Sequence, residues 1–94
     1  MLTEQIAALM QKPSSEIRAL PRCSSTRIED GEGRRFEIIT WCDKMDAGTY
    51  RVVISSHRIY PFGISTVAGA EGFTIDVVGN IRRIDSSEAR AVVR

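Results

Sequence analysis

The sequence predicts an α+β fold, in which an antiparallel sheet is combined with helices near both ends of the chain. Apolar side chains recur at helical spacing in residues 1–20, alternate with polar ones between short turns in residues 22–84, and return to helical spacing in residues 86–94. Separate stretches of helix and strand are typical of this class, with the helices covering one face of a meandering sheet. The 94 residues fit a single domain, 1–94.

The chain is expected to begin with a pair of helices. The first helix gathers its apolar side chains on one face, and these are Leu2, Ile6, Leu9 and Met10. It should end before Pro13, and Ser14 is then expected to cap a second short helix. That helix turns Ile17 and Leu20 inward, and Pro21 closes it.

The sheet is expected to be an antiparallel meander of about four to six strands. A segment over residues 23–29 leads through the turn 30–33 to a strand over 34–43, and a second turn at 44–48 leads to a strand over 49–57. Glycine and aspartate in both turns are the residues that hairpin turns favour. These four segments therefore predict two consecutive hairpins.

The later part of the sheet is less regular. Pro61 and Gly63 interrupt the alternation, so residues 64–68 are expected to form a short edge strand or an ordered loop. Alternation resumes in residues 73–77, and a turn then leads into residues 81–84. A last hairpin is expected there.

A short C-terminal helix is expected over residues 86–94. Asp85 can accept from the first helical amides while Glu88, three residues on, reaches back, which is a capping-box arrangement. The apolar side chains of this helix are Ala89, Val92 and Val93.

The register of the second hairpin decides which side chains share a face. With Asp43 opposite Thr49, Trp41 lies opposite Arg51 and can hold its guanidinium on the indole. The apolar face then carries Phe36, Ile38, Cys42, Tyr50, Val52 and Ile54, and the mixed face carries Arg35, Glu37, Ile39, Trp41, Arg51, Val53, Ser55 and His57. A slip by one residue would bury several ionisable groups, so this assignment of faces is strongly preferred.

The mixed face is the candidate binding surface. A tryptophan beside an arginine and ringed by charges has the composition of a protein-binding hot spot. The predicted interface residues are Arg35, Ile39, Trp41, Arg51, Val53 and His57. In the alternative interpretation, Trp41 is covered by residues 61–70 or by the terminal helix and belongs to a second small core.

Catalytic and cofactor signatures are lacking in the sequence. Cys42 falls on the apolar face and His57 on the mixed face, so the geometry does not favour a Cys-His nucleophile. Two cysteines nineteen residues apart and one distant histidine match no zinc spacing, and no glycine-rich segment opens a strand-to-helix phosphate loop. We therefore expect no catalytic residue, no metal and no cofactor.

Composition points to a small cytoplasmic protein. The N-terminus lacks a secretory signal, the apolar runs are too short to span a bilayer, and two cysteines are no disulfide framework. Arginine outnumbers lysine eleven to two, which is typical of a GC-rich bacterial genome. A net charge of +1 gives no long-range attraction to polyanions.

These observations favour a protein-interaction module, such as an accessory or inhibitor protein. The expected partner is another protein or a second copy in a homodimer, and membrane association is not expected. One alternative is a nucleic-acid-binding protein that uses the N-terminal helices and the hairpin arginines Arg22, Arg27, Arg34 and Arg35, although neighbouring carboxylates cancel their field. Another is a small-molecule binding domain with an apolar pocket.

Overall fold

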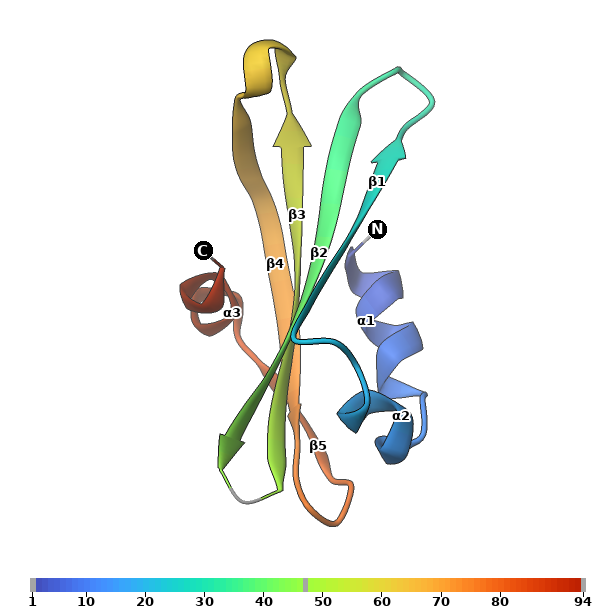
Figure 1. Cartoon of the computed structure of the whole chain (residues 1–94), viewed down its shortest axis with the longest axis vertical. Helices are drawn as coiled ribbons and strands as arrows, with labels where there is room; N and C mark the ends of the chain where they lie inside the picture. Colours follow the sequence, from blue (N-terminus) through green and yellow to red (C-terminus); the bar gives the residue numbers. More distant parts are fainter. Residues whose placement is uncertain (1, 47, 94) are drawn as a thin grey trace.

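Five antiparallel strands form one sheet in the order β1-β2-β3-β4-β5, and helical segments lie on both sides of it (Figure 1). The computed structural model describes residues 2–46 and 48–93. The elements are α1 (Leu2–Met10), α2 (Ser14–Arg18), β1 (Cys23–Glu29), β2 (Arg35–Asp46), β3 (Thr49–Ile59), the 3-10 turn η1 (Pro61–Gly63), β4 (Ser65–Ile75), β5 (Ile81–Ile84) and α3 (Ser86–Val92). The predicted α+β class and the antiparallel sheet are confirmed.

The segment α2 starts differently from the prediction. Pro13, with φ −55° and ψ 146°, occupies the N-cap position and makes no side-chain cap hydrogen bond. The Pro13 carbonyl accepts from the backbone amides of Glu16 and Ile17 at 3.0 and 3.2 Å. The prediction that Ser14 is the cap is therefore wrong, because the fixed φ of proline already supplies the extended residue that precedes the helix.

The helical segments cover both faces of the sheet, so the prediction that they cover one face is wrong. Ile6 and Ile17 from α1 and α2 share one buried cluster with the sheet residues Ile38, Cys42, Val52, Ile54, Phe73 and Ile75. Ala89 and Val92 from α3 share a second cluster with Val53, Ala70 and Ile84. Successive side chains of a strand point to opposite faces, so the neighbours Val52 and Val53 belong to different cores.

The register of β2 and β3 differs from the prediction by two residues. Trp41 lies opposite Val53, and Asp43 lies opposite Arg51. Strand β2 continues further toward the turn than expected, to Asp46, with an irregularity between Lys44 and Asp46. Because side chains alternate with a period of two, a shift of two residues leaves every side chain on its predicted face. The predicted cross-strand pairs were wrong, and the predicted assignment of side chains to the two faces was right.

Strand β4 is continuous over eleven residues, so the prediction of a break between residues 64–68 and 73–77 is wrong. A register shift between Ser56 and His57 absorbs one extra residue of β4. The small residues of this strand look like turn formers in the sequence, but Ala70 and Gly72 are buried there. Ala70 belongs to the cluster that includes the buried side chains of α3.

The Asp85 half of the predicted capping box of the C-terminal helix is confirmed. The Asp85 carboxylate accepts from the backbone N–H of Glu88 at 2.7 Å, and Ala89 and Val92 are buried. Val93 has extended backbone angles, so α3 ends earlier than the predicted 86–94.

The molecule is elongated, with extents of 44 × 23 × 21 Å. All three helices lie beside the middle and lower parts of the sheet in Figure 1, while the β1–β2 and β3–β4 hairpins continue upward beyond them and separate. This end of the sheet, which carries the loops at residues 30–34 and 60–64, is called the hairpin end below. It has strands but no covering helix.

Candidate interaction surface

Trp41 lies at the edge of the core under α3. It is half-buried and packs against the cluster that contains Val53. Its indole N–H donates to Ser55 Oγ at 3.1 Å, and Ser55 Oγ lies 2.9 Å from His57 Nε2. Ser55 is 0% exposed and His57 is 9% exposed, so this Ser-His pair gives no substrate access, and Ser55 instead accepts the hydrogen bond of the half-buried Trp41 indole.

The other predicted interface residues differ from one another in burial and in their partners. Arg51 Nη2 lies 3.7 Å from Asp43 Oδ2, directly across the strand pair. The predicted stacking on Trp41 is wrong, because the register places Arg51 opposite this carboxylate. Ile39 is half-buried, and Arg35 is exposed at the beginning of β2. The six residues do not form one exposed patch, since Val53 and His57 are buried.

Cys42 lies in the core between the sheet and α2. Its thiol is directed at the Ile17 carbonyl oxygen at 3.8 Å. Burial, and then the neighbouring charge of Asp43, raises the pKa of the Cys42 thiol. A protonated thiol in apolar surroundings is a poor nucleophile, so Cys42 acts as a packing residue. Cys23 is exposed at the start of the edge strand β1.

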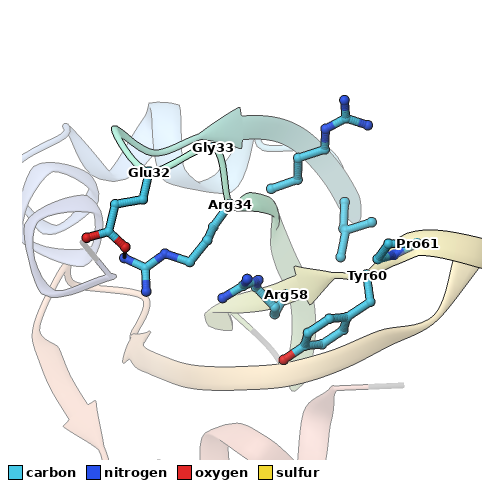
Figure 2. Close-up of a pocket in the computed structure, with 8 residues that line it drawn as sticks. Glu32, Gly33, Arg34, Arg58, Tyr60 and Pro61 are labelled. Carbon is cyan, nitrogen blue, oxygen red and sulfur yellow. Dashed lines mark ion pairs between the residues drawn. The ribbon is translucent and has the colours of Figure 1, made fainter.

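A hollow opens where the two hairpins separate (Figure 2). Its volume is about 520 Å³, and it is lined by Glu32, Gly33, Arg34, Arg35, Arg58, Ile59, Tyr60 and Pro61. Arg35 and Ile59 form the last pair of the β2–β3 ladder. Beyond it the Asp30 amide donates to the Arg34 carbonyl and the Tyr60 amide to the Ile64 carbonyl. These hydrogen bonds lie within each hairpin loop and do not join one hairpin to the other. The ladder of hydrogen bonds between β2 and β3 therefore ends at the pair Arg35–Ile59.

On the first wall of the hollow, which the β1–β2 loop forms, the positive charge of Arg34 is balanced by carboxylates. Arg34 Nε lies 2.6 Å from Asp30 Oδ2, and its Nη2 lies 3.2 Å from Glu32 Oε2. Desolvation raises the pKa of Asp30, but the backbone amides of Arg34 and Glu32 and the Arg34 guanidinium outweigh it and lower the pKa. Asp30 therefore stays ionised, and the charge of Arg34 has two carboxylate partners.

The second wall carries an arginine held by two aromatic rings. Arg58 lies opposite Phe36 in the sheet, and Tyr60 follows on the same face two residues later. The Arg58 guanidinium carbon lies 5.5 Å from the centre of the Phe36 ring and 5.1 Å from that of Tyr60. Its Nε is buried without a hydrogen-bond partner. Within residues 2–46 and 48–93, no carboxylate pairs with Arg58.

An aromatic side chain lies in the loop that joins β3 to β4. Phe62 is 99% exposed, and Tyr60 and Ile64 beside it are also exposed. Phe62 has φ 68° and ψ 23°, the left-handed region, which costs a residue with a side chain about 1–2 kcal/mol. Neither burial nor backbone preference accounts for phenylalanine at this position. Sequence reasoning missed this residue because Pro61 and Gly63 indicated only an interruption of the strand.

The chain matches no protein-family model, no curated protein and no solved structure. In the part of the chain that the structure describes, none of the helices combines the length and apolarity needed to cross a membrane. Among the same residues, no three histidine, cysteine, aspartate or glutamate side chains gather as a group that could hold a metal ion.

Proposed function

We propose that this protein is a small cytoplasmic protein-interaction module, an accessory or inhibitor protein without catalysis of its own. It binds a different protein with the hairpin end. The contact residues are Arg35, Arg58, Tyr60, Phe62 and Ile64. An arginine, a tyrosine and an exposed phenylalanine within one small surface have the composition of a binding hot spot.

The single observation that supports this proposal most strongly is Phe62. A fully exposed phenylalanine in a left-handed backbone contributes nothing to the fold, and glycine would suit the position better. Strained backbone and exposed apolar side chains are both typical of functional surfaces. The β3–β4 hairpin projects beyond the helices (Figure 1), and Phe62 in its loop is 99% exposed, so a partner can reach this side chain.

The charges around the hairpin end favour a protein over a nucleic acid as the partner. Arg27 lies 3.6 Å from Glu37, Arg34 pairs with two carboxylates, and Arg35 lies 3.9 Å from Glu29. Nucleic-acid affinity comes mainly from cations that neutralise phosphates, and each of these arginines has a carboxylate within 4 Å that offsets part of its charge. Arg35, which was predicted from sequence as an interface residue, stays in the proposed surface because it lines the hollow.

The test compares Phe62→Gly with a matched control, Val78→Ala. Val78 is also an exposed apolar residue in a turn, but it belongs to the β4–β5 turn at the other end of the sheet. The wild type and both variants are used to capture partners from the source cell, and a captured protein is then purified and its dissociation constant measured. Phe62→Gly should weaken binding about 30-fold, which corresponds to about 2 kcal/mol. Val78→Ala should leave binding unchanged.

Stability separates this loss of binding from misfolding. Glycine relieves the left-handed strain, so Phe62→Gly should be as stable as the wild type or up to about 1 kcal/mol more stable in urea unfolding. A partner that binds both variants equally well would refute the proposal. Sedimentation of the wild type alone identifies the homodimer: self-association that Phe62→Gly abolishes would make the partner a second copy.

A further inference from the structure

We infer that the hollow between the two hairpins is an oxyanion-binding site, in which Arg58 holds a carboxylate or a phosphate group. The inference rests on the proposed function, because the oxyanion is carried by the partner segment that contacts the hairpin end. It names the chemistry of that segment: a negatively charged oxygen group next to an apolar contact for Phe62. Nothing in the fold itself uses the Arg58 guanidinium for an ion pair within the described residues.

The aromatic neighbours of Arg58 fix the guanidinium in one place. Its carbon is within 5.5 Å of the Phe36 ring centre and 5.1 Å of the Tyr60 ring centre. A long arginine side chain normally loses conformational entropy when it binds, and here the rings already impose much of that order. The guanidinium N–H groups lie in its plane, so contacts with aromatic faces leave its edge free to donate to an anion.

Arg58 is the arginine of the hollow whose charge is available to bind an oxyanion. Arg34 and Glu32 form an ion pair at 3.2 Å and line the same hollow (Figure 2). Asp30 takes the other side of Arg34 at 2.6 Å. Arg35 and Glu29, 3.9 Å apart, are both largely exposed, so this pair is weak and offsets only part of the Arg35 charge. An oxyanion that enters the hollow therefore meets one uncompensated guanidinium and a second, loosely paired one.

The purified protein is titrated with sodium acetate and, separately, with inorganic phosphate, against sodium chloride at equal ionic strength. The readouts are the NMR resonances of the Arg58 Nε–H group and of the Phe36 and Tyr60 amides. A saturable change with a dissociation constant in the millimolar range is expected for a single charged contact in water. Arg58→Lys keeps the charge but loses the planar donor fork, and should weaken binding about tenfold in the amide readout. The matched control Arg82→Lys, an exposed arginine on β5, should not change it.

The two probes distinguish the sources of the oxyanion. Saturation by acetate as well as phosphate supports a carboxylate side chain or chain terminus, and saturation by phosphate alone supports a phosphorylated segment. Equal shifts with chloride, or equal affinity in Arg58→Lys and the wild type, would overturn the inference and leave an adventitious ion only. Urea unfolding of Arg58→Lys confirms that the variant is folded.

Failure of this inference is distinguishable from failure of the proposed function. Phe62→Gly should bind acetate or phosphate as the wild type does, because Phe62 does not line the hollow. If Phe62→Gly abolishes partner binding and Arg58→Lys does not, the hairpin end is the interface and the oxyanion site is refuted. If both variants bind the partner normally, the interface itself is refuted.

Discussion

Gly72 on β4 lies close to residues of both β3 and β5, and its replacement by alanine should destabilise the fold. A Cβ at this position would lie 2.6 Å from the Val52 carbonyl oxygen, 2.9 Å from Val53 Cγ2 and 3.1 Å from Ile84 Cδ1. The side chain of Ile84 can rotate away. The Val52 oxygen belongs to the backbone of the central strand, and a contact of 2.6 Å is shorter than real Cβ atoms show, so the backbone itself would have to move. The sheet would have to shift.

Overpacking of this kind costs about 1–3 kcal/mol, and each kcal/mol lowers the melting temperature of a domain of this size by about 4–8 °C. The assay is urea and thermal unfolding of Gly72→Ala, followed by far-UV circular dichroism. Gly31→Ala is the matched control, because no heavy atom lies within 4 Å of a Cβ built there. It should change stability by less than about 0.5 kcal/mol. Equal stability of Gly72→Ala and Gly31→Ala would refute the close approach of the strands as the reason for glycine.

Two further variants test the second core and one turn. Trp41→Phe keeps an aromatic ring but removes the hydrogen-bond donor to Ser55, so it should lower the free energy of unfolding in urea by about 1 kcal/mol and leave partner binding intact. Loss of partner binding at unchanged stability would instead favour an interface on the mixed face of the sheet. Asp76 accepts from the amides of Val78 and Asn80, and the Asn80 bond is the main reason that its pKa is lowered. A lowered folded pKa stabilises the fold above the unfolded value of about 3.9 and loses this effect as the pH falls through the folded value. Asp76→Asn should therefore be less stable than the wild type at pH 7, and unfolding curves of the two should converge below about pH 4.

Local patterns in the sequence were sufficient for the class of fold and for the two faces of the sheet. Alternation assigns Ile38 and Val52 to one face whatever the exact partners, which is why a two-residue error in register did no harm. The cap at Asp85 could be predicted because it depends only on neighbours in the chain. The continuity of β4 could not be predicted, because the glycine and alanine residues at positions 69–72 are compatible with a turn as well as with a closely packed strand.

The candidate surface was harder to predict, because it depends on distant pairs. The contact of Arg58 with Phe36 requires the β2–β3 register, and its contact with Tyr60 requires β3 to continue through residue 59. The position of α3 on the mixed face follows from a chain path that hydrophobic spacing does not specify. That path determines that Val53 is buried and that Trp41 is half-buried.

The two cores of this sheet are completed from opposite ends of the chain. Each strand pairs only with its neighbours in sequence, so the whole ladder can assemble hairpin by hairpin without closing a long loop. The core around Ile54 is then completed when α1 and α2 pack on the sheet, whereas the core around Val53 is completed when α3 packs on it. During synthesis the first helices are available before the sheet exists, whereas α3 is made only after all five strands. Until α3 has been made, a nascent chain therefore exposes the apolar residues Val53 and Ile84 on an otherwise paired sheet.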